Sequence, residues 1–331
     1  MPLLNSSYNP PLFFKNGHLS TIYSGLVRKI EHLEQLRLRL TLPDTDFLDL
    51  DWSYSKTPSK KIVLIIHGLE GSSKRAYIQG SAKALTESGF DVCAINLRGC
   101  SGSMNNLYRS YHSGATEDLQ SVIDHVLQLD KYSSIFLHGF SLGGNLLLKY
   151  LGEEGKLPKE IKGAVAISVP CQLADSLHQL LQFKNFLYAR RFKGNLVEKL
   201  KLKKQSFPSL ISDLDIEQIK TLKDFDDIYT SRAHGFKDAM DYYAKCSSLQ
   251  FLNTIEIPTL LINAENDSFL GDECYPVDIA KLHKTLFLEV PKYGGHVGFY
   301  GPDNFTYTER RTLEFIHLKI HILVLQLTHH N

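Results

Sequence analysis

Long apolar segments are absent from the middle of this sequence. The longest uninterrupted apolar run there is Ile62–Ile66, whereas a membrane-spanning helix needs about 20 such residues. The stretch after Phe315 is interrupted by Lys319 and by several histidines. The first residues, Met1–Tyr23, lack the basic start and the apolar core of a signal peptide. We therefore expect a soluble, cytoplasmic protein.

Cysteine is scarce, and an excess of charge of either sign is missing. The five cysteines are scattered, odd in number and without a Cys-x-x-Cys pair, which argues against a disulfide framework and against a zinc site. The 37 Lys and Arg residues nearly balance 36 Asp and Glu residues, so the formal net charge is +1. This balance gives no reason to expect nucleic acid as a partner. We accordingly predict no metal, no organic cofactor and no nucleic acid.

The length and the apolar content are sufficient for one large core. A chain of 331 residues that is 43% hydrophobic can bury such a core, with a modest insertion, without dividing into several independent domains. We therefore predict a single domain over residues 1–331.

Two alternating segments near the start predict a β-hairpin. In Leu36–Leu42 apolar residues alternate with arginines, and in Phe47–Trp52 they alternate with aspartates. Such alternation is typical of strands that have one face exposed. Pro43 and Asp44 lie between the two segments, so we expect two half-exposed antiparallel strands joined by a turn.

Continuous apolar runs separated by helical stretches follow the hairpin. Helical periodicity is clearest in Thr116–Leu129 and in Leu142–Leu151. Apolar runs that are buried on both faces are typical of a parallel sheet covered by helices. The pattern therefore predicts an α/β fold with a mostly parallel central sheet flanked by helices. The runs are Ile62–Ile66, Phe90–Ile95, Ser134–Leu137, Gly163–Ile167, Thr259–Ile262 and Thr285–Val290.

The alternation of strands and helices stops between Cys171 and Leu252, where the sequence indicates several amphipathic helices. We predict that residues 171–252 form a helical cap inserted in the domain. Its basic residues either meet an anionic group of the substrate or form a solvated helix face, and the second alternative is the commoner one. An apolar face beside them suggests peripheral membrane contact through the cap. The basic residues are Arg190, Arg191, Lys193, Lys199, Lys201, Lys203 and Lys204, and the apolar face is Leu173, Leu177, Leu180 and Leu181.

The most specific motif is Gly-x-Ser-x-Gly, centred on Ser141. It directly follows the predicted strand Ser134–Leu137 and directly precedes a predicted helix, which is the setting that a nucleophilic serine on a tight turn requires. Gly139 and Gly143 leave out the Cβ atoms that would clash on such a turn. The bare pattern also occurs by chance in loops, but its position between strand and helix favours Ser141 as a catalytic nucleophile.

A serine hydroxyl needs a base to remove its proton, and in this type of fold an acid and then a histidine follow the serine along the chain. The polar loop Asn263–Phe269 comes directly after the predicted strand Thr259–Ile262, where an orienting carboxylate belongs. Asp267 is the predicted acid. Glu265 competes with it because it lies in the same loop.

Glycines surround His296 in the segment Gly294–Phe299, which follows the last predicted strand. They allow a loop that carries the histidine to fold over the edge of the sheet toward Ser141. We predict that His296 is the base. His138, adjacent to the nucleophile motif, is interpreted as structural.

A tetrahedral intermediate requires two backbone N–H donors for its oxyanion. One comes from the residue after the nucleophile, Leu142. The second is assigned to Leu69, in the segment His67–Gly71 after the predicted strand Ile62–Ile66. The alternative for this segment is a plain glycine turn.

Together these motifs resemble the YheT-like branch of the α/β-hydrolase superfamily, over roughly Pro11–Phe315. The resemblance implies an α/β-hydrolase fold and places nucleophile, acid and base at Ser141, Asp267 and His296. Proteins of this branch resemble carboxylesterases, short- to medium-chain acylglycerol lipases or alcohol acyltransferases. The matching segments are Asn16–Leu19, His67–Gly71, Asn96–Gly102, Tyr111–Gly114, the residues around Ser141, Asn263–Phe269 and Gly294–Phe299.

Three function classes fit these residues. The leading prediction is a serine esterase that cleaves short- to medium-chain acyl esters or acylglycerols through an acyl-enzyme, since this chemistry needs only the triad and an oxyanion hole. An alcohol acyltransferase would use the same residues while excluding water, a difference that depends on the cap. A non-catalytic binding protein would usually have lost a member of the triad, and here each member is present.

Overall fold

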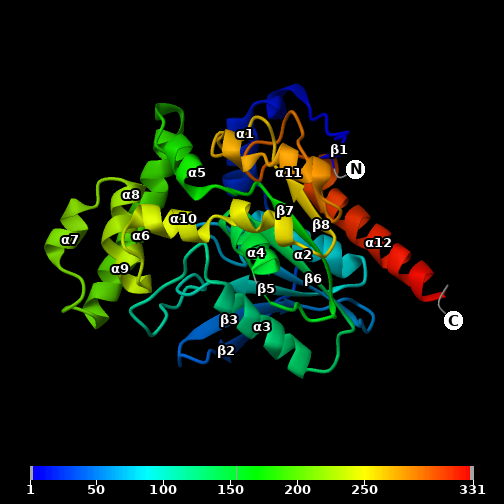
Figure 1. The fold of residues 1–331 in the computed structure, drawn as a ribbon, viewed down its shortest axis with the longest axis horizontal. Coiled ribbons are helices and arrows are strands. Elements are labelled where there is room, and N and C mark those ends of the chain that lie inside the picture. Colours follow the sequence, from blue (N-terminus) through cyan, green and yellow to red (C-terminus); the bar gives the residue numbers. More distant parts are fainter. Residues whose placement is uncertain (1–2, 154, 329–331) are drawn as a thin grey trace.

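The computed structural model of the protein describes residues 3–153 and 155–328. Within them a sheet of nine strands has the order β1-β9-β8-β7-β6-β4-β5-β3-β2 (Figure 1). Neighbouring strands from β1 to β5 in this order are parallel, and β3 and β2 continue the sheet as an antiparallel edge. The mostly parallel sheet predicted from the apolar runs is confirmed. The strands are β1 Leu3–Leu4, β2 Leu36–Thr41, β3 Phe47–Ser53, β4 Lys61–Ile66, β5 Asp91–Asn96, β6 Ser134–Phe140, β7 Ile161–Ile167, β8 Thr259–Ile262 and β9 Leu286–Glu289.

Helices cover both faces of this sheet. Alternate residues of β4 point into two separate apolar cores: Ile62, Leu64 and Ile66 pack on one side, and Val63 and Ile65 on the other. This burial on both faces explains why β4 is a continuous apolar run. The first core contains α3 (Thr116–Gln128), α4 (Leu142–Gly152) and α11 (Val277–Leu282), and the second contains α2 (Ala76–Glu87) and α12 (Tyr307–Thr328).

The predicted hairpin forms, but one of its strands is buried rather than half-exposed. Every residue of β3 is buried because β3 pairs with β2 on one side and with β5 on the other. Its aspartates remain charged through partners on β2: Arg37 binds Asp51 and Arg39 binds Asp49, each at 2.8 Å from the guanidinium Nε. The aspartates that alternate with apolar residues in β3 are therefore paired with arginines and are not exposed to water. The short edge strand β1 was not predicted.

The helices between β7 and β8 gather at one end of the molecule, beyond the strands (Figure 1). They form two small apolar clusters apart from the two cores at the sheet, centred on Leu200 and on Tyr242. No helix in the described part of the chain is long and apolar enough to cross a membrane. The helices are α5 Leu173–Leu180, α6 Phe186–Ser206, α7 Asp213–Gln218, α8 Leu222–Phe225, α9 Ser231–His234 and α10 Ala239–Cys246.

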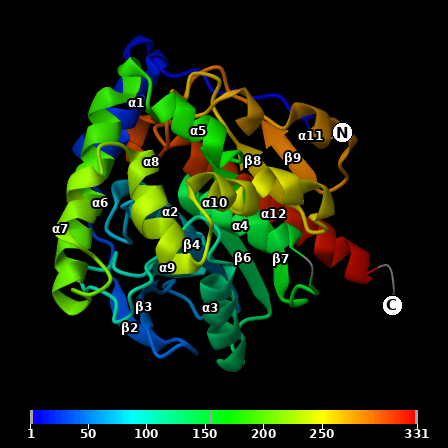
Figure 2. The ribbon, with the colours of Figure 1, turned by 60° about the vertical axis from the view of Figure 1, so that its left-hand side comes forward.

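The N-terminal segment crosses to the same end of the molecule. Helix α1 (Gly17–Ile22) and the π-helical turn that continues it, Tyr23–Val27, lie beside the beginning of α6 (Figure 2). The side chains of His18 and Tyr188 meet there, with 3.3 Å between Nδ1 and the hydroxyl oxygen. Segments that are about 170 residues apart in the sequence are thereby neighbours.

Candidate active site

Ser141 occupies a strained turn between β6 and α4. Its φ and ψ are 52° and −122°, a region that residues with a side chain rarely adopt. A Cβ atom at Gly139 would lie 2.6 Å from the Gly143 oxygen, and one at Gly143 would lie 2.5 Å from the His67 oxygen. These close approaches explain why both motif glycines are needed. The Ser141 amide is tied to the Ile167 carbonyl of β7 at 2.8 Å.

The structure brings Ser141, His296 and Asp267 together in one hydrogen-bonded line. Nε2 of His296 is 2.9 Å from Oγ of Ser141, and its Nδ1 is 2.8 Å from Oδ2 of Asp267. The Asp267 carboxylate is fully buried, and its Oδ1 accepts the amide N–H of Phe269 at 3.0 Å. Glu265, the competing carboxylate, is exposed. Of the two candidates, the structure places Asp267 against the histidine.

Three polar side chains that the sequence analysis did not single out hold the loop of His296. Thr21 Oγ1 accepts the amide N–H of His296 at 2.8 Å, and Ser168 Oγ accepts that of Val297 at 2.9 Å. Asn266 Oδ1 accepts the amide N–H of Gly295 at 2.9 Å. Thr21 belongs to the helix that begins within the Asn16–Leu19 motif. The sequence showed this motif, but it gave no role to a segment so far from the histidine.

The residues predicted to form an oxyanion hole lie on either side of Ser141. Leu142 is the first residue of α4, and Leu69 follows Gly68, whose added Cβ would lie 2.9 Å from the Ser141 Cβ. Among the described residues, the backbone N–H groups of Leu69 and Leu142 have no hydrogen-bond partner. Two free donors beside a serine hydroxyl are what a developing oxyanion requires.

The loop that carries Leu69 is held from two sides. His67 is buried, which lowers its pKa to about 4, so it is neutral: Nδ1 donates to the Gly68 carbonyl at 2.7 Å, and Nε2 accepts the Leu97 N–H at 3.1 Å. Glu70 has a positive φ of 53° and is buried. Its carboxylate accepts the Tyr111 hydroxyl at 2.7 Å and the Lys199 ammonium at 2.9 Å. Because Lys199 comes from α6, a helix outside the sheet contacts the loop that carries Leu69.

The basic residues predicted on the cap do not share one environment. Arg190 and Lys201 are exposed, whereas Lys203 is buried. Burial lowers the Lys203 pKa to about 8, and its ammonium donates to Asn105 Oδ1 at 2.8 Å and to the Leu107 carbonyl at 2.6 Å. The alternatives of a solvated face and of an anion site therefore do not apply to Lys203. This lysine attaches α6 to the loop after β5.

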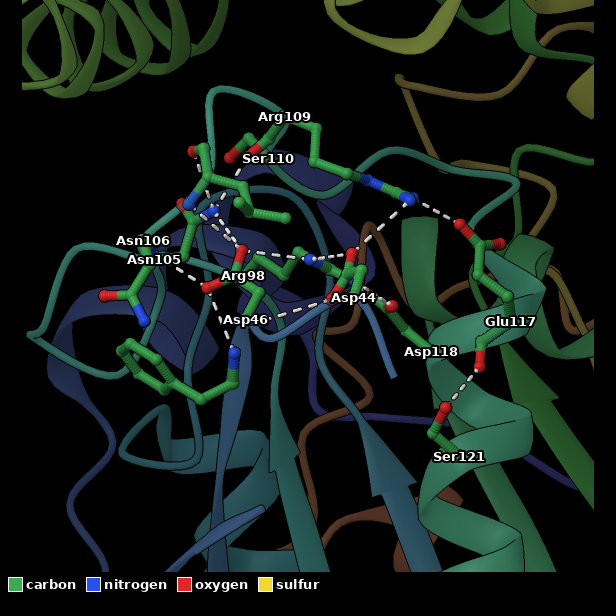
Figure 3. A network of polar contacts seen from close by, with 12 residues as sticks. Asp44, Asp46, Arg98, Asn105, Asn106, Arg109, Ser110, Glu117, Asp118 and Ser121 are labelled. Carbon is green, nitrogen blue, oxygen red and sulfur yellow. Dashed lines mark hydrogen bonds and ion pairs between the residues drawn. The ribbon is translucent and has the colours of Figure 1, made fainter. Parts of the chain in front are cut away.

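That loop is built on a buried ionic network (Figure 3). Arg98 binds Asp118 of α3 through Nε at 2.7 Å and through Nη2 at 2.6 Å, and its Nη1 binds Asp46 at 2.9 Å. Asn105 donates to the same Asp46 carboxylate at 2.7 Å. The Asn96–Gly102 motif therefore stabilises the loops around the site.

A cavity of about 270 Å³ lies over Ser141 and His296, and apolar side chains form most of its wall. Leu173, Leu177 and Leu180 of α5 all line it. These leucines face inward, so they do not form the exposed face from which membrane contact through the cap was predicted. Of that set Leu181 alone is exposed. Within the described residues, no group of three or more His, Cys, Asp or Glu side chains is arranged to hold a metal ion.

Comparisons of sequence place the chain among known hydrolases. A family model described as alpha/beta hydrolase fold matches residues 61–302. The chain is 34% identical over 304 residues to "Putative esterase YheT" of Escherichia coli, which covers 90% of this chain and 88% of that protein. It is 27% identical over 327 residues to human "Phospholipase ABHD3", with 95% and 80% covered. A yeast "Monoacylglycerol lipase" is 27% identical over 250 residues, 73% of this chain and 55% of the lipase.

Solved structures share the fold at lower identity. The Pyrococcus furiosus esterase Pf2001 superimposes with a TM-score of 0.58 and 20% identity, over 86% of this chain and 91% of the esterase. Est1E from Butyrivibrio proteoclasticus superimposes with a TM-score of 0.57 and 18% identity, over 86% and 99% of the two chains. The resemblance to the YheT-like branch is confirmed by the relative at 34% identity, and the chain therefore belongs to the α/β-hydrolase family.

Proposed function

We propose that this protein hydrolyses carboxylic esters through an acyl-enzyme formed on Ser141, with His296 as base and Asp267 as the group that orients it. The observation that carries the proposal is the continuous hydrogen-bonded line from Ser141 Oγ through both ring nitrogens of His296 to Asp267. A serine hydroxyl becomes nucleophilic when a positioned base accepts its proton. The relatives named esterase and lipase support the same reaction.

The reaction proceeds in two halves. Ser141 Oγ attacks the ester carbonyl while its proton moves to Nε2 of His296, and the N–H groups of Leu69 and Leu142 stabilise the oxyanion. His296 then protonates the leaving alcohol, which departs and leaves an acyl-Ser141 ester. Water enters, gives a proton to His296 and attacks the acyl carbon. His296 then returns this proton to Ser141 Oγ as the bond between the acyl carbon and Oγ breaks, which releases the acid and restores the enzyme. The Asp267 carboxylate stabilises the imidazolium in both halves.

The substrates we propose are short- to medium-chain acyl esters or acylglycerols. A cavity of about 270 Å³ with a mainly apolar wall lies near the lower end of the range for small-molecule pockets. Such a wall accepts a hydrocarbon chain, and the size limits its length. We assign the role of cap over this cavity to residues 171–252, whose helices α5 and α6 supply part of the wall.

Hydrolysis of p-nitrophenyl esters from acetate to palmitate, by the wild type and by Ser141→Ala, tests the proposal. We expect the activity of the wild type to be highest with short or medium acyl chains. In Ser141→Ala the activity should fall by about 10⁴-fold or more. Ser103→Ala, which changes an exposed serine in a loop, is the control and should keep the wild-type rate. Adding ethanol distinguishes the two fates of the acyl-enzyme. Ethyl ester as the main product at modest ethanol would contradict hydrolysis and indicate an alcohol acyltransferase.

A further inference from the structure

Exposed large apolar side chains are concentrated in two short segments of the chain. Of 21 such side chains in the described structure, six lie within residues 12–27 and four within residues 181–187. Phe183 is 94% exposed and Phe13 is 78% exposed. Single exposed apolar residues are ordinary, but a concentration of them marks an interaction site. The ten residues are Leu12, Phe13, Leu19, Ile22, Leu26, Val27, Leu181, Phe183, Phe186 and Leu187, and we call them the apolar rim.

The two halves of the apolar rim adjoin each other at the cavity. His18 and Tyr188 connect the two segments, with their rings stacked at a centroid distance of 5.8 Å. Ile22 and Leu26 of the first half line the same cavity as Ser141. The second half continues into the part of α6 whose Tyr188 also lines it. The rim therefore borders the cavity that contains the nucleophile.

The charged side chains within the two segments of the apolar rim are all basic. Residues 12–29 and 181–197 contain no Asp or Glu, although the whole chain has 36 of them. Lys29, Lys184 and Arg190 are exposed, and among the described residues none of the three has an ion-pair partner. By contrast, Lys199, further along α6, is used internally by Glu70. Exposed apolar groups bordered by unpaired cations match an anionic lipid surface.

We propose that the apolar rim docks on the surface of a bilayer that contains anionic lipids, with the cavity opening toward the acyl esters held there. The phenylalanine and leucine side chains enter the boundary between headgroups and acyl chains, and the cations approach the lipid phosphates. The proposal names a source for the ester substrate, and in that respect it rests on the proposed function. The docking itself needs no catalysis.

Co-sedimentation of the full chain with vesicles tests the docking, and the Ser141→Ala protein keeps this test separate from the esterase proposal. We expect the protein to bind phosphatidylcholine vesicles that contain about a third phosphatidylglycerol, and to bind vesicles of phosphatidylcholine alone more weakly. At 1 M salt, where charges are screened within about 3 Å, we expect the protein to bind both kinds of vesicle equally. Absence of binding to the anionic vesicles at low salt would overturn the proposal, whatever the esterase assay shows.

A pair of apolar substitutions locates the contact. Phe13→Ser with Phe183→Ser is expected to lower the partition coefficient by about tenfold or more, since two rings no longer leave water. Leu36→Ser with Leu282→Ser is the matched control, because both leucines are exposed but lie outside the rim. Equal binding by the two double variants would contradict the assignment.

A pair of charge substitutions tests the cations. Lys184→Gln with Arg190→Gln is expected to weaken binding to anionic vesicles by roughly fivefold per charge, and Lys56→Gln with Lys60→Gln, two exposed lysines elsewhere, is expected to weaken it little. A second copy of the chain is the competing occupant of the rim. Two results together would support this alternative: the wild type elutes as a dimer in gel filtration but does not bind vesicles, and the Phe13→Ser, Phe183→Ser variant elutes as a monomer. They would show that the rim contacts a second copy of the chain and not a lipid surface.

Discussion

The strand ends and the helices of residues 171–252 contribute to the pocket in different ways. Ser141, Asp267 and His296 are held by backbone geometry: a strained φ at the serine, close glycine contacts, and hydrogen bonds to loop amides. The helices instead supply apolar side chains to the cavity wall and contact the surrounding loops through Lys199 and Lys203. The proposed reacting atoms are thus fixed by the sheet, and their surroundings depend on a second body with its own apolar clusters.

One contact between the two regions lies at the loop that carries Leu69. Glu70 directly follows Leu69, and its carboxylate receives Lys199 from α6 and the Tyr111 hydroxyl from the loop before α3. A displacement of α6 would remove the Lys199 ammonium from the buried carboxylate of Glu70, a residue whose backbone φ is positive. The helices therefore affect the position of Leu69 as well as the shape of the cavity. Lys199 is a positioning residue in this arrangement.

We expect the largest effect from a change in the proposed triad at the strand ends. Asp267→Asn keeps the size of the side chain but removes the charge that stabilises the His296 imidazolium, so we expect kcat for p-nitrophenyl butyrate to fall by about 10³- to 10⁴-fold. Glu265→Gln, a change of the same type two residues earlier in the loop, should retain at least half the activity because Glu265 is exposed. If the Glu265 variant were the inactive one, the acid would have to be reassigned.

The contact from α6 predicts the next largest effect. Lys199→Met leaves the Glu70 carboxylate without its cation and is expected to lower kcat by about ten- to a hundredfold, the range for a lost hydrogen bond to a charged group. Lys201→Met, on the same helix but in an exposed pair with Glu198, should change kcat little.

A double-mutant cycle separates positioning from a general loss of stability. Glu70→Gln with Lys199→Met removes both charges, so we expect it to be more active than Lys199→Met alone and the two substitutions to be non-additive in kcat. Additive losses, or a change in KM with kcat unchanged, would show that Lys199 acts on substrate binding and not through Glu70.

Features that depend on residues close together in the sequence could be predicted, whereas contacts between distant segments could not. Ser141 is recognisable because strand, glycines and helix are consecutive, and the parallel sheet because each buried strand is a continuous apolar run. Thr21 and Lys199 were not assignable in the same way, since each acts on a residue more than 100 positions away. The full burial of β3 was missed because its aspartates alternate as exposed residues do, while their arginine partners lie on another strand.

Buried neutral histidines beneath the site predict a dependence of stability on pH. Burial lowers the pKa of His138 to about 4, below the ordinary 6.5 of the unfolded chain. Between these values the unfolded state binds more protons, so the free energy of unfolding falls as pH falls. The free energy of unfolding, measured with urea, should therefore decrease between pH 7 and pH 5, and we expect this decrease to be roughly 2 kcal/mol smaller in His138→Leu than in the wild type. His32→Leu, at an exposed histidine, is the control, and an equal pH dependence in both variants would contradict the assignment.

The smallest effect concerns the contact that joins the N-terminal helix to the histidine loop. Thr21→Val keeps the shape of the side chain but leaves the His296 amide N–H without its acceptor, which is worth about 1 kcal/mol. We therefore expect kcat to fall about fivefold, with KM for a short ester nearly unchanged, because the loop carrying the base is less well positioned. Thr21→Ser retains the hydroxyl and should restore most of the rate. A serine variant as slow as the valine variant would mean that packing of α1, and not the hydrogen bond, supports the loop.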